Sequence, residues 1–100
     1  IHIHPYGTYV CLEGPRFETA AEISMMRLLG GDVVGMTVVP EVVLARELDI
    51  DYATVAVVTN YGAGMAPGKV SHEEVYEVFG QAKVRLQKLI MAALDVIVDG

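Results

Sequence analysis

Hydrophobic and polar positions follow one another along the chain in blocks whose lengths predict alternating strands and helices. Short apolar runs at residues 9–12 and 32–36 predict two buried strands. A longer apolar run at residues 52–60 is rich in valine and is typical of a strand buried on both faces. Three strands, two short and one long, are therefore expected.

Between these runs the apolar residues recur at helical spacing. Residues 17–29 predict a helix, and the pair Gly30-Gly31 is expected to end it. Pro40 fits the first turn of a second helix that continues to Glu47, because the N–H that proline lacks would have no partner there.

A Gly/Pro-rich loop over residues 61–70 precedes the longest predicted helix. Ser71 and Glu74 have the spacing of a capping box at its start. One apolar stripe then continues along it through Val75, Val78, Phe79, Ala82, Leu86, Leu89, Ile90, Ala93 and Ile97. The order β-α-β-α-β-α predicts an α/β fold with a largely parallel sheet.

Composition changes this picture in one respect. The chain of 100 residues is 53% hydrophobic, and three strands make a thin parallel sheet to cover on both faces. Some apolar surface is therefore expected to face another segment or subunit. We interpret residues 1–100 as the C-terminal part of a longer polypeptide whose upstream strands complete the sheet.

Charge and cysteine content exclude several classes of partner. The net charge of −6 and the absence of a Lys/Arg-rich patch argue against nucleic acid and anionic membranes. The single cysteine, Cys11, lies in an apolar run and is expected to be a buried small hydrophobe. Nothing resembles a signal peptide and no run is long enough to span a bilayer, so a cytoplasmic location is expected.

Two short motifs carry little weight. Gly62-x-Gly64 resembles part of a dinucleotide-binding glycine motif. In such a motif a helix begins directly after the glycines, whereas here Pro67 and Gly68 separate them from the next predicted helix. His2 and His4 alternate like strand neighbours but have no Cys, His or carboxylate partner at ligand spacing, so no metal site is expected.

Polar residues at the predicted strand ends are better candidates, each with a simpler alternative. Glu18 could be a first-turn carboxylate that interacts with the helix dipole. Asn60 could contact a ligand edge or cap a loop. Thr37, beside Met36, could donate to an oxyanion or simply favour a strand, and His72 could face solvent.

Taken together, these residues resemble the trimeric purine nucleoside phosphorylase family that also contains the methylthioadenosine phosphorylases. The similarity rests on GTYV at residues 7–10, EGPRFET at 13–19, AE at 21–22, DVVGMTVVPE at 32–41, LARE at 44–47 and TN at 59–60. The resemblance implies a three-layer phosphorylase fold with a mixed, largely parallel central sheet. It also implies phosphorolysis, in which phosphate attacks the ribose C1′ as the purine leaves.

The resemblance assigns a role to each candidate. Phe17 would lie against the purine face, Met36 under the ribose, and Thr37 would bind phosphate. Glu18 would accept a hydrogen bond from the base N1–H, and Asn60 would bond N7 and the 6-substituent. Glu18 and Asn60 are thus the implied catalytic residues: the purine leaves as an anion, which Asn60 would stabilise by donation while Glu18 would hold the base by its N1–H.

Glu18 and Asn60 are also the pairing that the 6-oxopurine branch of the family carries. Adenine N1 is an acceptor and would face Glu18 lone pair to lone pair, which can reject a substrate by roughly 10⁴-fold. His72 matches the histidine that this branch places on the ribose 5′-hydroxyl. The loop Gly62-Ala63-Gly64-Met65 departs from the mammalian-type enzymes at the 5′ end.

The sequence therefore predicts a 6-oxopurine nucleoside phosphorylase acting on inosine and guanosine, with phosphate as cosubstrate and no metal or organic cofactor. The resemblance suggests a homotrimer or a dimer of trimers. The family's phosphate-binding glycine loop, its upstream Arg and His, and the aromatic residue lent by a neighbouring subunit precede the matched residues, so these residues alone are not expected to be a competent catalyst. The alternatives are a methylthioinosine or methylthioadenosine phosphorylase, and a non-catalytic purine-binding or assembly module.

Overall fold

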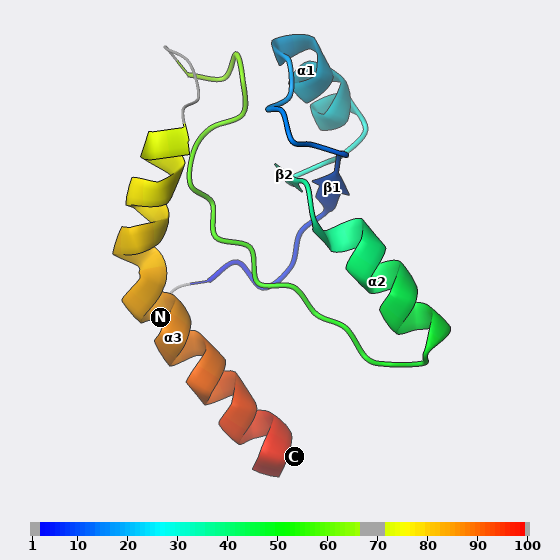
Figure 1. Ribbon diagram of the computed structural model, residues 1–100, viewed down its shortest axis with the longest axis vertical. Helices are drawn as coiled ribbons and strands as arrows, with labels where there is room; N and C mark the ends of the chain where they lie inside the picture. Colours follow the sequence, from blue (N-terminus) through cyan, green and yellow to red (C-terminus); the bar gives the residue numbers. More distant parts are fainter. Residues whose placement is uncertain (1–2, 67–71, 100) are drawn as a thin grey trace.

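The computed structural model describes residues 3–66 and 72–99. Along the chain these residues form the elements β1 (Tyr9–Cys11), α1 (Ala20–Leu28), β2 (Val33–Gly35), α2 (Val38–Glu47) and α3 (His72–Asp99) (Figure 1). The predicted alternation of short strands and helices is confirmed through α2.

The two strands form a parallel sheet with α1 as the crossover between them. Tyr9 lies opposite Val33 and Cys11 opposite Gly35. The ladder continues one residue further, because Leu12 N donates to Gly35 O at 2.9 Å. Since parallel strands end at the same edge of a sheet, the segments that follow β1 and β2 leave it side by side.

Helix α1 begins three residues later than predicted. Thr19 is its N-cap: the Thr19 hydroxyl accepts from Glu22 N, and the Glu22 carboxylate accepts from Thr19 N, which completes a capping box. At the other end Gly30 has a φ of 94°, a left-handed conformation that glycine adopts without strain. The predicted stop at the glycine pair is confirmed.

The other two helices agree with the sequence pattern where the structure describes them. Pro40 lies in the first turn of α2, as predicted. Helix α3 begins at His72, but Ser71 of the predicted capping box lies outside the described residues, as do residues 67–70 of the predicted loop. Among the described helices, none combines the length and apolarity needed to cross a membrane.

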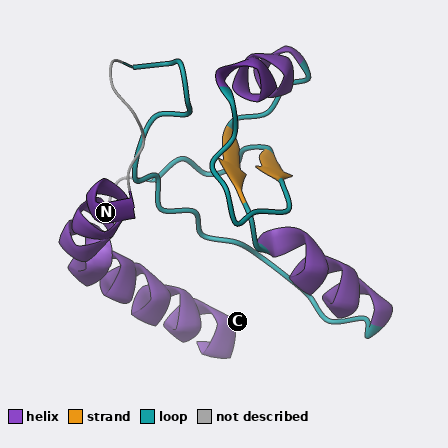
Figure 2. Cartoon of the chain, turned by 45° about the horizontal axis from the view of Figure 1, so that its top comes forward, coloured by secondary structure: helices purple, strands orange, loops and turns teal. Residues whose placement is uncertain are grey.

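The strand predicted at residues 52–60 is wrong for this structure. The segment is an irregular connection after α2, drawn as a loop in Figure 2. A strand needs neighbours for its backbone N–H and C=O groups. Among the described residues no ladder bond reaches positions 52–59, and Val55 and Val58 remain 56% and 66% exposed. Apolar sequence favours a strand but does not supply its partner.

The core is small for so apolar a chain. Only Ile23, Met26 and Ala82 are buried hydrophobic residues among those described. Cys11 is half-buried, not buried as expected. Part of the predicted stripe of α3 is exposed, including Phe79, Ile90 and Ile97. The radius of gyration of 15.3 Å also exceeds the roughly 13 Å typical of a 100-residue domain. Much apolar surface is thus left without cover from the described residues.

Candidate functional site

A hollow of about 1000 Å³ lies along β1 and β2 and extends past the ends of both strands. Its walls come from the two strands, the loop before α1, the turn after β2, residues 52–63 and parts of α1, together with Met65 and, from α3, Val75. Five of the six candidate residues line it, and they come from three separate segments: Phe17, Glu18, Met36, Thr37 and Asn60. The fold thus brings together side chains that lie up to forty-three positions apart in the sequence.

The first two segments are placed by the sheet. The loop after β1 carries Phe17 and Glu18, both half-buried, and the turn after β2 carries Met36 and Thr37. Glu18 precedes the N-cap of α1, so it is not the first-turn helix carboxylate that the sequence left open. Thr37 is the N-cap of α2, yet its side chain makes no capping bond. The Thr37 hydroxyl therefore stands at the positive end of a helix without a capping role.

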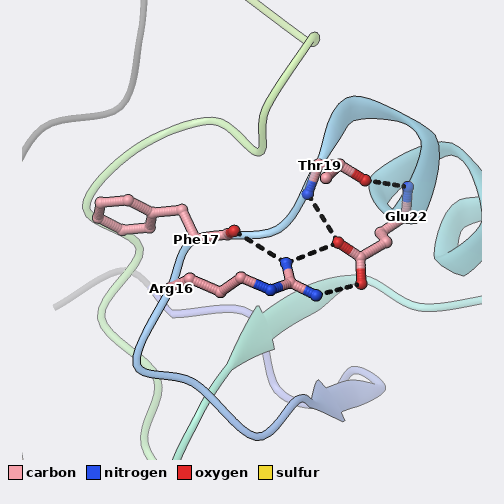
Figure 3. Close-up of polar contacts among 4 residues, drawn as sticks. All are labelled: Arg16, Phe17, Thr19 and Glu22. Carbon is pink, nitrogen blue, oxygen red and sulfur yellow. Dashed lines mark hydrogen bonds and ion pairs between the residues drawn. The ribbon is translucent and has the colours of Figure 1, made fainter.

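An ion pair holds the loop that carries Phe17 and Glu18 (Figure 3). Arg16 Nη1 and Nη2 donate to the two carboxylate oxygens of Glu22 at 2.8 and 3.1 Å. Arg16 Nη1 also donates to the Phe17 carbonyl oxygen at 3.1 Å, and Thr19 N donates to Glu22 Oε1 at 2.9 Å. The side-chain bonds from Arg16, with the Thr19 backbone N–H next, lower the pKa of Glu22 to about 2. Its bond to Glu22 raises the pKa of Arg16.

Sequence reasoning did not single out this arrangement. The T-x-x-E spacing of Thr19 and Glu22 was the available signal, since it is the capping-box pattern. No comparable sequence pattern predicts the contact between Arg16 and Glu22. A separation of six residues is not a spacing at which side chains regularly meet.

The Asn60 side chain is engaged with its own neighbours. Its Nδ2 donates to Tyr61 O at 2.8 Å, and its Oδ1 accepts from the Thr59 hydroxyl at 2.8 Å. These bonds support the loop-capping alternative and also orient the amide. An amide offers two N–H groups and two lone pairs on its oxygen, so one donor and one acceptor position remain beyond these two bonds. Loop capping and ligand contact are therefore compatible.

Close packing against α1 brings the Asn60 segment to the hollow. A Cβ added at Gly62 would lie 2.9 Å from Ile23 Cδ1 and 3.1 Å from Ile23 Cγ2. Only glycine allows this approach to a core side chain that is 5% exposed. Apolar walls with a few convergent polar groups are typical of sites for small organic molecules.

Two candidate features lie outside this description. His72 is the first residue of α3, but its side chain lies outside the described part of the structure, so its predicted contact with the ribose is not tested. His2 lies outside the described residues, so the His2–His4 pair is not tested. Within residues 3–66 and 72–99, no group of three or more His, Cys, Asp or Glu side chains could hold a metal ion.

A parallel sheet with a helical crossover and a hollow lined by its strands are typical of α/β folds, and comparison with known proteins gives the family. The model of the phosphorylase superfamily matches residues 1–95. The chain belongs to this superfamily.

Named relatives refine the comparison. The chain is 62% identical over 94 residues to a 6-oxopurine nucleoside phosphorylase of Pyrococcus furiosus, which covers 94% of the chain and 36% of that relative. It is 53% identical over 88 residues to a probable S-methyl-5′-thioinosine phosphorylase of Methanothermobacter thermautotrophicus, covering 88% of the chain and 31% of that protein. The chain thus spans about a third of the length of these relatives.

Solved structures share the fold. A double mutant of the adenosine/methylthioadenosine phosphorylase of Schistosoma mansoni, in complex with adenine, superposes with a TM-score of 0.91 at 35% identity. This similarity covers 97% of the chain and 35% of the schistosome chain. The predicted α/β phosphorylase fold is confirmed.

Proposed function

We propose that the protein containing these residues catalyses phosphorolysis of 6-oxopurine nucleosides, inosine and guanosine, to the free base and ribose 1-phosphate. One observation carries the proposal: Phe17, Glu18, Met36, Thr37 and Asn60, from three segments, line a single hollow. The relatives named 6-oxopurine nucleoside phosphorylase, at up to 62% identity, support the same reaction.

Base selection in this proposal depends on Glu18 and Asn60. The carboxylate of Glu18 accepts the N1–H of a 6-oxopurine, and the remaining N–H of Asn60 donates to N7 or O6, both of which are acceptors. As phosphate oxygen forms a bond to C1′, the C1′–N9 bond breaks and its electron pair moves onto the purine. Donation from Asn60 then stabilises the purine anion.

The remaining roles follow the resemblance. Phe17 packs against the purine ring, and Met36 supports the ribose. Thr37 donates to phosphate, which suits a hydroxyl at the N-terminus of the ten-residue α2. His72 binds the ribose 5′-hydroxyl. Phosphate is the cosubstrate, with no other cofactor, and the proposed assembly is a homotrimer or a dimer of trimers in the cytoplasm.

The second candidate is a methylthioinosine phosphorylase. The relative at 53% identity with that name favours it, and methylthioinosine carries the same 6-oxopurine base. The two candidates therefore share Glu18 and Asn60 and differ only at the 5′ end.

The deciding experiment measures phosphorolysis of inosine, guanosine, adenosine, methylthioinosine and methylthioadenosine by the full polypeptide that contains this chain. Preference for inosine and guanosine is expected. Preference for methylthioinosine selects the second candidate, and preference for adenosine or methylthioadenosine contradicts the assigned role of Glu18. No turnover of any of the five would favour a non-catalytic purine-binding or assembly module.

Asn60→Asp tests the base contact directly. The carboxylate cannot donate to O6 of inosine but can accept from the 6-amino group of adenosine, so the ratio of kcat/KM for inosine to that for adenosine should fall by about tenfold or more. Arg85→Met is the control, because Arg85 is an exposed residue of α3 that does not line the hollow. An unchanged ratio in Asn60→Asp would show that Asn60 does not read the base.

A further inference from the structure

The loop at residues 14–19 is held by more than the helix cap that ends it. Figure 3 shows Arg16 reaching past Phe17 to Glu22 on the first turn of α1. The guanidinium spans both oxygens of the carboxylate at 2.8 and 3.1 Å and also bonds the Phe17 carbonyl at 3.1 Å. The same carboxylate accepts from Thr19 N at 2.9 Å.

These bonds enclose Glu18 from both sides. The Phe17 carbonyl belongs to the peptide group that joins Phe17 to Glu18, and Thr19 N belongs to the peptide group that joins Glu18 to Thr19. Both peptide groups are therefore attached to one Arg16–Glu22 pair. With both planes held, the φ and ψ of Glu18 have little freedom, and backbone conformation limits the directions open to a side chain.

We propose that Arg16 and Glu22 are positioning residues that aim the Glu18 carboxylate at the purine base and so set the preference for 6-oxopurines. This inference rests on the proposed function, which makes Glu18 the group that accepts the base N1–H. Neither Arg16 nor Glu22 is assigned a contact with substrate.

Because the Arg16–Glu22 pair is exposed to solvent, its effect on the position of Glu18 can be distinguished from its effect on folding stability. The Arg16 side chain is 65% exposed and that of Glu22 is 28% exposed. Ion pairs exposed to solvent add little to folding stability. A bidentate guanidinium–carboxylate pair nevertheless has a defined geometry, which lysine cannot reproduce. Removal of the pair should therefore alter substrate choice more than stability.

Electrostatics keeps the pair intact under assay conditions. The pKa of Glu22 is lowered to about 2, chiefly by its bonds to Arg16 and Thr19 N. The carboxylate is thus ionised throughout the neutral range in which phosphorolysis would be measured.

The test compares Arg16→Met, Arg16→Lys and Glu22→Gln in the full polypeptide. Small misplacements of a reacting group cost up to about a hundredfold in rate. The inosine-to-adenosine ratio of kcat/KM should fall by about ten- to a hundredfold in Arg16→Met and Glu22→Gln, and by less in Arg16→Lys, which keeps the charge. Arg85→Met is the matched control, because Arg85 is an exposed residue of α3 that does not line the hollow. Its ratio should not change.

A purely structural role gives a different result. It would lower the activity toward both nucleosides by the same factor, leave the ratio unchanged, and overturn the positioning role. Failure of the proposed function is recognised separately, because a wild-type protein that does not prefer inosine shows it before any variant is compared.

A second measurement does not need turnover. Hydrogen–deuterium exchange of the peptide covering residues 16–22, recorded without substrate, should speed up about tenfold at the Thr19 amide in Glu22→Gln, since a weaker neutral acceptor replaces the charged carboxylate. Arg85→Met should leave this exchange as in the wild type. Exchange unchanged in Glu22→Gln and Arg16→Met would show that the pair does not hold the loop, whatever the activity.

Discussion

Replacing Gly62 by alanine should disturb the packing that holds the Asn60 segment against α1. The added Cβ would lie 2.9, 3.1 and 3.2 Å from Ile23 Cδ1, Cγ2 and Cγ1. Ordinary contacts begin near 3.4 Å, so several tenths of an ångström must be gained at three atoms of one side chain. Ile23 is 5% exposed and has little space to move into. Overpacking of this kind costs about 1–3 kcal/mol.

The same substitution at Gly80 is the control. Gly80 lies within α3, and a Cβ there would meet nothing within 4 Å. Alanine should stabilise this helix by about 0.4–1 kcal/mol. Thermal unfolding of the two variants, in the full polypeptide at equal concentration, is therefore expected to shift Tm in opposite directions. The shift is about 2–4 °C per kcal/mol for a domain of 150–250 residues.

A double-mutant cycle identifies the contact responsible. Ile23→Val removes Cδ1, the nearest atom, and by itself costs about 0.5–1.5 kcal/mol. Combined with Gly62→Ala it should cost less than the sum of the two single variants, because the shortened side chain leaves room for the new methyl group. Strict additivity, or a fall in Tm for Gly80→Ala equal to that for Gly62→Ala, would refute the packing argument.

The remaining predictions concern the start of α1. Thr19→Ala removes the acceptor for Glu22 N and should destabilise by about 1 kcal/mol, with Thr19→Ser close to wild type; equal losses in urea unfolding would contradict the cap. The pH dependence of Glu22 follows from its pKa, which lies below the usual 4.5 at about 2 in the folded state, so its stabilising effect is fully present above pH 4.5 and is lost as the pH falls toward 2. Because the pair is exposed to solvent, the difference in unfolding free energy between wild type and Glu22→Gln should be small and should shrink over that interval. A difference independent of pH would show that the bonds of the Glu22 carboxylate do not stabilise the fold.

Local signals predicted most of the helix ends. Gly30 ends α1 because a left-handed residue is needed there, and Pro40 suits the first turn of α2; both requirements depend on neighbouring backbone alone. The apolar spacing predicts a start of α1 three residues before the observed one, whereas the T-x-x-E pattern of Thr19 and Glu22 marks the observed N-cap. Glu18 therefore lies just before the N-cap and outside the first turn of the helix.

Residues 52–60 show where local signals fail. The valine-rich run favours a strand by its side chains, but a strand also needs backbone partners from elsewhere in the chain. None of the described residues supplies them, and the segment remains irregular. The spacing of apolar residues indicates which side of a segment is apolar, but it does not indicate whether another strand is available to pair with that segment.

By itself, the sequence determined the kinds of groups available at the strand ends and, through its spaced motifs, the phosphorylase family. Only the tertiary structure decided that Phe17, Met36 and Asn60 share one hollow. Parallel pairing of β1 with β2 aligns the first two segments, and contact of Gly62 with Ile23 brings in the third. The tertiary structure also pairs Arg16 with Glu22 across the loop that carries Glu18. Such proximity arises from pairing and packing between distant segments, which the order of residues along the chain does not express.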